Sequence, residues 1–329
     1  MKEFISFIAS VFFRSYKPLI QTIRLFNPAM TKIVNSCVLF PILSLLSSCN
    51  SIRNQQEQEN YIRELKEWKS GRIERLKSKT GWLNLAGLYW LNEGDNQFGS
   101  DSSNKIIFPA IAPAFCGNIR LKNDSVFFTA DPIQSINVNG NPVSEMSLKN
   151  DMEVSPTVME TGSLAWMIIK RDTQYGIRLR DYKHPRVHEL DSIPSYPVEM
   201  KWRITADFIP FDTIRKIEVG TVTGGTESDD CPGILTFKIN RKKYTLFPFR
   251  EGDEFFIIFA DKTSGKDTYG TGRFMYTNGP DSKNKVIIDF NKAYNPPCAF
   301  SSFATCPMPP RENILDVEVT AGEKVVHLE

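Results

Sequence analysis

The chain has 329 residues, of which 24% are charged and 12% aromatic, and its formal net charge at pH 7 is +2. Residues 1–49 hold five basic residues and one acidic residue, so the rest of the chain has 35 basic and 37 acidic residues and a formal charge of −2. This balance excludes the basic surface typical of a nucleic-acid-binding protein, and the 280 residues after residue 49 suffice for one large domain or two small ones.

The N-terminal segment, residues 1–48, has the pattern of a bacterial lipoprotein signal. Lys32 precedes an apolar run over residues 33–43, and Leu46-Ser47-Ser48-Cys49 follows. Signal peptides show this order of positive charge, apolar region and small residues before the cut. We expect translation to begin at Met30 and Cys49 to carry the lipid. The sequence therefore predicts a cell-envelope protein anchored to a bacterial membrane on its periplasmic or surface face; an uncleaved N-terminal anchor is the alternative.

Residues 49–58 are polar and predict a tether from the lipid to a domain over residues 59–329. One amphipathic helix is predicted at the start of this domain, from Glu59 to Lys77, although Gly71 weakens it in the middle. The apolar residues that recur there at helical spacing are Tyr61, Leu65, Trp68 and Leu76.

After residue 81, short runs rich in β-branched and aromatic residues alternate with Gly, Asn, Asp and Pro, which is typical of strands and turns. The predicted class is mainly β, an antiparallel sandwich or partly open barrel with the helix packed on it, and an α+β fold stays open. A boundary inside the domain is expected near residues 192–196. The predicted strands are Lys105–Phe108, Ser125–Thr129, Ala165–Lys170, Gly176–Arg180, Lys201–Phe208, Lys216–Val222, Ile234–Ile239, Tyr244–Phe249, Phe255–Phe259, Gly272–Thr277, Val286–Phe290 and Leu315–Thr320.

Polar residues are densest between Asp261 and Pro310. An apolar run over residues 286–288 predicts a buried strand, and Asp289 to Phe300 then form a loop stiffened by two prolines. A strand that leads into such a loop can present polar side chains in a fixed array. This segment therefore supplies most of the candidate site residues.

The same segment carries a family resemblance. Thr263-Ser264-Gly265, Thr268-Tyr269-Gly270, Gly272-Arg273-Phe274 and the run from Asp289 to Phe300 are similar to a bacterial family of unknown function, DUF1684. The resemblance extends from Trp68 to Glu323, and it includes residues 81–91 and 176–181. It implies no activity that can be named.

Four arginines predict an anion site. Arg178 and Arg180 are two residues apart on a predicted strand and so point to one face, and guanidinium groups match carboxylate or phosphate. The alternative is internal pairing with Asp181, Asp261 or Asp289. The first functional hypothesis is a pocket that binds a small polar or anionic ligand and that Arg273 also lines. Its predicted ligand-binding residues are Arg178, Arg180, Arg203, Tyr269, Asn291, Tyr294 and Asn295.

Two other functions stay open. In a hydrolase-like enzyme, Asp261 or Asp289 would act as general base and Arg273 would stabilise developing negative charge. In a purely structural envelope protein, the same residues would only hold the fold.

The remaining candidates concern cysteine and metal chemistry. Cys298 is either a nucleophile or one half of a disulfide with Cys306. His184 and His188 have the spacing of two ligands on one helix face, but Pro185 lies between them, so no metal is predicted. No phosphate-binding loop or nucleophile elbow occurs, and no cofactor is expected.

Overall fold

The computed structural model describes residues 55–327. The signal segment, the start at Met30 and the lipidated Cys49 lie outside these residues, so these expectations stay predictions. The chain divides into two units, residues 1–64 and 65–329. The sheets and both cavities belong to the second unit.

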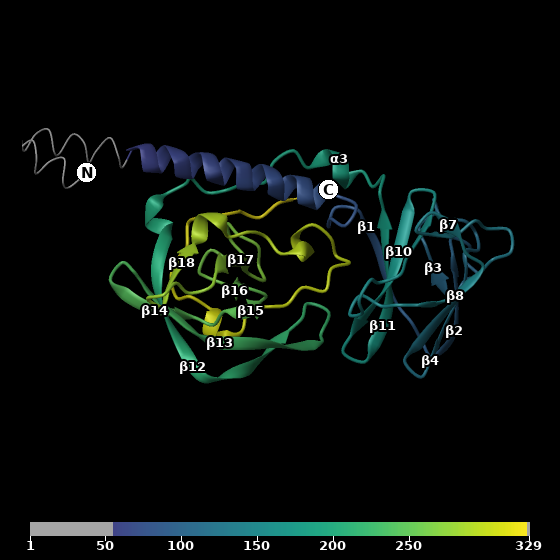
Figure 1. Ribbon diagram of the computed structural model, residues 1–329. Coiled ribbons are helices and arrows are strands. Elements are labelled where there is room, and N and C mark those ends of the chain that lie inside the picture. The colour runs from purple at the N-terminus through teal and green to yellow at the C-terminus, as the bar shows by residue number, and fades with distance from the viewer. Residues whose placement is uncertain (1–54, 328–329) are drawn as a thin grey trace, which may run out of the picture. The chain divides into compact units, whose positions relative to one another are not determined.

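A helix covers residues 55–77, shown in purple in Figure 1, and so begins four residues before the predicted start. Within the second unit its inner stripe consists of the buried Leu65, Arg72 and Leu76 and the half-buried Trp68. These positions lie on one helical face, and Gly71 does not interrupt the helix. Among the described residues, no helix is both long enough and apolar enough to cross a membrane.

Two sheets from residues 85–181 enclose one core. Phe98, Phe128, Trp166 and Ile177 come from both sheets and are at most 1% exposed, and the rings of Phe98 and Trp166 meet edge to face at 5.6 Å. The first sheet has the order β1(Leu85–Trp90), β11(Gln174–Asp181), β10(Leu164–Arg171), β9(Val158–Thr161), β6(Asn137–Val138), β7(Asn141–Pro142). The second has the order β3(Ile106–Ile107), β2(Gly94–Gly99), β4(Gly117–Lys122), β5(Ser125–Ala130), β8(Glu145–Leu148), and only its β2–β3 pair is parallel.

Two further antiparallel sheets from residues 203–289 enclose another core, in which Trp202, Leu235, Phe259 and Phe290 are buried. Edge-to-face contacts of Phe290 with Trp202 and Phe259 tie the two sheets together. The four-stranded sheet has the order β14(Lys242–Leu246), β13(Thr226–Ile239), β12(Arg203–Gly220), β18(Lys285–Asp289). The three-stranded sheet has the order β15(Phe249–Glu251), β16(Glu254–Phe259), β17(Arg273–Asn278).

Short helices occupy the connections between strands. They are α3(Arg186–Glu189), η1(Met200–Trp202), η2(Phe290–Lys292), η3(Pro297–Ala299) and η4(Arg311–Asn313). The predicted class is confirmed: the fold is mainly β, with several antiparallel sheets, a half-barrel and a helix near the N-terminus. The boundary near residues 192–196 stays a prediction.

Strand β12 is one strand, where the sequence predicts two, over Lys201–Phe208 and Lys216–Val222. It runs unbroken from Arg203 to Gly220, and its pairing with β13 shifts register between Pro210 and Arg215. Proline lacks an N–H for the ladder and is tolerated at a bulge. The polar and proline-containing middle of the strand, residues 209–215, therefore lacks the pattern by which the two flanking parts are predicted.

The strand predicted over Leu315–Thr320 is wrong. This segment joins no sheet and is held by separate hydrogen bonds, such as Leu315 N–H to the carbonyl of Ala260 at 2.8 Å and the Tyr244 hydroxyl to the carbonyl of Asp316 at 3.3 Å. The carbonyls of Val319 and Ala321 accept hydrogen bonds from the Arg273 side chain instead of from a neighbouring strand. A guanidinium therefore takes the place of a β-ladder here.

Candidate functional site

Asp289 at the end of β18 and Asn291 in η2 make structural hydrogen bonds. The Asp289 carboxylate accepts the N–H of Asn291 at 3.1 Å and caps η2. The side-chain amide of Asn291 exchanges two hydrogen bonds with the backbone of Glu199, at 3.0 and 3.2 Å. Both residues are buried, so they fasten η2 to the segment before β12 and line neither cavity described below.

Arg273 and Asp261 form an ion pair sealed from water. Arg273 is 0% exposed, and its Nη2 lies 2.5 Å from Asp261 Oδ2. Arg273 also donates to the carbonyls of Val319 and Ala321, and burial lowers the pKa of its guanidinium. Because neither side chain faces a cavity, this pair has the geometry of a fold-holding contact, and no substrate could reach it.

The other three arginines do not share a cavity, although Arg178 and Arg180 both lie on β11 and over the Trp82 ring, 5.5 and 5.9 Å from its centre. The Arg180 guanidinium donates to the carbonyl of Gly81 and to Asn84 Oδ1, the latter at 2.7 Å. Arg203 is exposed at the start of β12, and Arg178 lines a cavity of about 230 Å³. The expected single pocket that contains all four arginines is therefore not formed.

Tyr269, Cys298 and Cys306 form a small cluster after β17. The Tyr269 hydroxyl donates to the carbonyl of Cys298 at 2.9 Å, and the Cys298 N–H donates to Cys306 Sγ at 3.0 Å. Both cysteines are free thiols, so the candidate disulfide is not formed. A hydrogen bond from the Cys306 thiol lowers the pKa of Cys298 to about 7, and the same bond raises the pKa of Cys306.

We expect Cys298 to react with iodoacetamide at pH 7 faster than the other described cysteines, because the thiolate is the nucleophile. Replacing Cys306 with alanine removes the donor and should slow this reaction several-fold, whereas Cys306→Ser keeps a donor and should preserve it. Mass spectrometry of labelled peptides against pH measures both rates. Cys116, whose pKa burial raises to about 12, is the slow internal control, and equal labelling of Cys116 and Cys298 would contradict the assignment.

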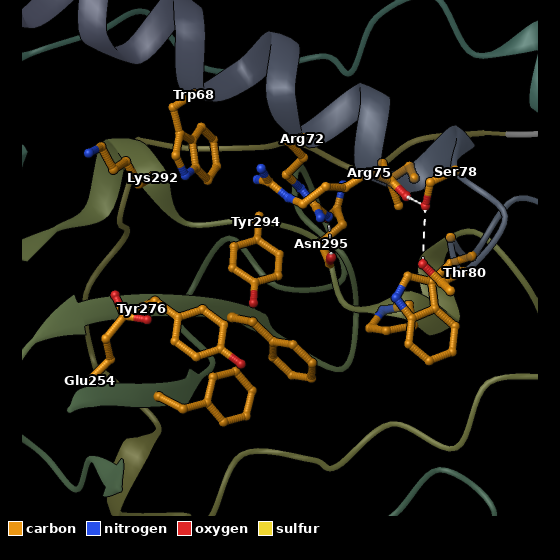
Figure 2. Close-up of a pocket in the computed structure, with 16 residues that line it drawn as sticks. Trp68, Arg72, Arg75, Ser78, Thr80, Glu254, Tyr276, Lys292, Tyr294 and Asn295 are labelled. Carbon is orange, nitrogen blue, oxygen red and sulfur yellow. Dashed lines mark hydrogen bonds between the residues drawn. The ribbon is translucent and has the colours of Figure 1, made fainter. Parts of the chain in front are cut away.

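The larger cavity, of about 720 Å³, lies beneath the C-terminal half of the helix (Figure 2). Its floor is strand β16, strand β17 and the loop after η2, and of the predicted ligand-binding residues it contains Tyr294 and Asn295. Figure 2 shows Arg72 and Arg75 reaching from the helix toward these two residues. The helix and the C-terminal loop thus build one site from distant parts of the sequence.

Six of the sixteen residues that line the cavity are aromatic. The rings of Phe256 and Tyr276 stack at 4.9 Å, and those of Tyr276 and Tyr294 are nearly parallel, 11° apart, at 6.4 Å. Burial raises the pKa of Tyr294, so its phenol stays protonated. The lining aromatic residues are Trp68, Trp82, Phe256, Phe274, Tyr276 and Tyr294.

Two cationic side chains of this cavity, Arg72 and Arg75, differ in their partners. Arg72 pairs with the buried Glu323, Nε to Oε1 at 2.6 Å, donates to the carbonyl of Asn295 at 2.7 Å, and lies 4.3 Å from the Tyr294 ring centre. Arg75 is exposed and, within the described part of the chain, has no carboxylate within 4.0 Å and no side-chain hydrogen bond. Arg72 therefore positions the wall, while Arg75 can offer a full guanidinium fork to a ligand.

Two further polar groups of the cavity lack partners in the described chain. The Asn295 amide donates to the carbonyl of Lys324 at 2.7 Å, but its buried Oδ1 accepts nothing. The Tyr294 hydroxyl makes no hydrogen bond to described residues either, and Figure 2 shows it pointing away from the helix. The Tyr294 hydroxyl is therefore available to a ligand, whereas Asn295 Oδ1 is an unpaired acceptor buried beneath the cavity surface.

Sequence reasoning missed the helical side of this site. The sequence pattern places Trp68 on the apolar face of the predicted helix and singles out neither Arg72 nor Arg75. One signal was present: Arg72 falls in the apolar stripe, seven residues after Leu65 and four before Leu76. A charged residue at such a position needs a buried partner, which here is Glu323.

The family model described as "Protein of unknown function (DUF1684)" matches residues 188–324. Over this stretch the chain is similar to the DUF1684 family. The DUF1684 segment contains Tyr294, Asn295 and the ion pair of Arg273 with Asp261, whereas Arg72 and Arg178 lie before it. The resemblance predicted upstream, over residues 81–91 and 176–181, falls outside the matched range and stays a prediction.

No curated protein matches the chain. Among solved structures, an uncharacterized protein of Haloarcula marismortui is 28% identical over 42% of this chain and 78% of its own, with a TM-score of 0.36. Two FHA domains, one studied for phosphothreonine-dependent interactions and one from FhaA, are each 17% identical over 28% of this chain, with TM-scores of 0.20. The matched regions cover 92% and 97% of those domains. At these TM-scores the likenesses assign neither a fold nor a ligand to the chain.

Proposed function

We propose that this DUF1684 protein is a lipid-anchored envelope protein that binds a small organic anion with a flat ring in the larger cavity. The observation that carries the proposal is a cavity of about 720 Å³ with six aromatic residues in its lining. Two of its polar groups, the Arg75 guanidinium and the Tyr294 hydroxyl, have no hydrogen-bond partner among the described residues.

The proposed ligand combines a flat ring with an anionic group, because the cavity lining combines aromatic rings with an unpaired guanidinium. Aromatic walls favour flat rings, which gain offset-stacked or edge-to-face contacts beyond their area burial. An unpaired guanidinium favours a carboxylate or phosphate group, because its donors match two oxygens at once.

The proposed location at the membrane rests on the sequence of the N-terminal segment. The order of Lys32, the apolar run and Leu46-Ser47-Ser48-Cys49 supports lipid attachment at Cys49, with the membrane as partner through that lipid. Intact mass of the protein extracted from membranes tests this. A chain that begins at Cys49 with added diacylglycerol supports it, and a chain that retains residues before Cys49 refutes it.

Binding is tested by thermal shift and calorimetry with four probes: an aromatic carboxylate, a nucleoside monophosphate, a sugar phosphate and a neutral sugar. We expect stabilisation by an anionic ring compound. The variant Arg75→Gln should weaken its binding about tenfold, because a charge-assisted hydrogen bond contributes roughly 1.5–3 kcal/mol and each 1.4 kcal/mol is a factor of ten.

The matched control for this test is Arg311→Gln, because Arg311 is also exposed but lies outside the cavity. It should leave affinity unchanged. Lack of stabilisation by every probe would remove the proposal and favour the purely structural role. An affinity equally insensitive to Arg75→Gln and to Trp68→Leu would place any ligand elsewhere.

The hydrolase alternative receives no support from the geometry. Asp261 is held by Arg273 and by Thr263, whose N–H and hydroxyl lie 2.6 and 2.5 Å from its Oδ1. Asp289 caps η2. A general base must reach the proton it abstracts, and neither carboxylate lines a cavity described here, so no hydrolytic step is proposed.

A further inference from the structure

The second cavity, of about 230 Å³, lies between strand β11 and the loop that follows η3. Trp82, Phe274 and Pro297 line both cavities, but the charged residues of this one are Arg171, Arg178 and Glu227. Its volume exceeds the roughly 30 Å³ share of one water molecule. It therefore has its own chemistry and room for a small ion.

Arg178 is a buried cation that no described carboxylate contacts directly. It is 6% exposed, its Nε is buried with no hydrogen-bond partner, and no described carboxylate lies within 4.0 Å. Burial and the neighbouring Arg171 lower its pKa to about 10, so it stays charged at neutral pH. Asp151 favours the Arg178 charge only from beyond 4.0 Å. A buried charge without a direct partner is expensive, so an anion bound to Arg178 would complete the site.

Thr305 joins the two guanidinium groups. Its hydroxyl oxygen accepts from Arg171 Nε at 3.2 Å and from Arg178 Nη2 at 3.3 Å. A hydroxyl has two acceptor lone pairs and one donor. With both lone pairs used, its hydrogen remains as a third donor beside the two guanidinium groups.

Arg171 and Glu227 fix the rest of the charge balance. Arg171 Nη1 is held by Asp151 Oδ2 at 2.8 Å, while its Nε lies 3.7 Å from the half-buried carboxylate of Glu227. Burial raises the pKa of Glu227. Glu227 is thus the group that would compete with an incoming anion for Arg171.

We propose that this cavity binds a phosphate-type tetrahedral oxyanion through Arg178, Arg171 and Thr305, either as the free ion or as the terminal group of a small phosphomonoester. Three donors from separate residues suit an oxyanion with three or four oxygens, whereas a planar carboxylate is satisfied by one guanidinium fork. This site goes beyond the proposed function, because it uses none of the unpaired polar groups of the larger cavity.

The test is isothermal titration of the full chain in detergent with inorganic phosphate, glycerol 3-phosphate and acetate. We expect one saturable site for a phosphate probe, at least tenfold weaker binding in Arg178→Gln and several-fold weaker binding in Thr305→Val. Glu227→Gln should tighten binding, because it removes the competing carboxylate. Tighter binding of glycerol 3-phosphate than of phosphate identifies the phosphomonoester as the source, and the reverse identifies the free ion.

Arg75→Gln separates this proposal from the proposed function, since it should leave phosphate binding unchanged. If Arg178→Gln does not fold, Thr305→Val and Glu227→Gln still decide the matter, because both residues are only half-buried. The inference is overturned if neither phosphate probe binds at millimolar concentration, or if acetate binds as tightly as the phosphate probes. It is also overturned if neither Thr305→Val nor Glu227→Gln changes the affinity for phosphate.

Discussion

Replacing Arg273 with alanine is expected to lower the free energy of unfolding by about 3–5 kcal/mol, the cost of leaving a buried charge without its partner. The variant leaves Asp261 buried beside an empty space, and it removes the donor that serves the carbonyls of Val319 and Ala321. Urea unfolding followed by circular dichroism measures the loss. Such a loss is a large fraction of the total stability of an ordinary domain.

Two controls make the Arg273 result specific. Lys262→Ala breaks an ion pair with Asp316 whose side chains are 55% and 66% exposed, and it should leave stability near the wild-type value. Arg273→Met combined with Asp261→Leu removes both charges and should recover part of the loss. Wild-type stability of Arg273→Ala would contradict the structural role and reopen a functional one.

Replacing Arg72 with methionine is expected to cost a similar amount, about 3–5 kcal/mol, and to abolish ligand binding in the larger cavity. Glu323, whose side chain is 4% exposed, would lose its cation, and the carbonyl of Asn295 would lose its donor. The contact of the guanidinium with the Tyr294 ring disappears as well. The cavity would lose both its charge balance and the orientation of one wall.

The second variant of this pair is Arg72→Met with Glu323→Gln. The glutamine keeps an oxygen that can accept the N–H of Asn295, now 2.7 Å from Glu323 Oε2, and it carries no charge. It should therefore recover part of the stability in urea unfolding. Arg75→Gln, on the exposed side of the same helix, should leave stability nearly unchanged, and an equal loss in both helix variants would argue against the buried pair.

Local pattern explains which parts of the fold could be predicted. The helix follows from apolar residues at helical spacing, and β10, β16 and β18 follow from compact runs of β-branched and aromatic residues. Strands β2 and β4, with sequences GDNQFG and GNIRLK, lack such runs. They exist because their alternate residues pack into a shared core, and tertiary packing overrides weak strand propensity.

The candidate site, too, could be predicted from the sequence only in part. Tyr294 and Asn295 could be found because a buried strand leads into a proline-stiffened loop. The role of each arginine could not, because guanidinium groups in ion pairs and in ligand sites look alike in sequence. Arg273 is sealed beside Asp261, whereas Arg178 faces a cavity without a carboxylate.

The sequence by itself determined the mainly β class, the helix, and the segment that contains Tyr294 and Asn295, because these depend on periodicity and composition over short windows. Only the tertiary structure decided which charges are compensated. Arg72 and Glu323 are 251 positions apart, and Arg178 and Thr305 are 127 apart. Charge pairing depends on distance and burial in space, so the two cavities became visible only once the chain was folded.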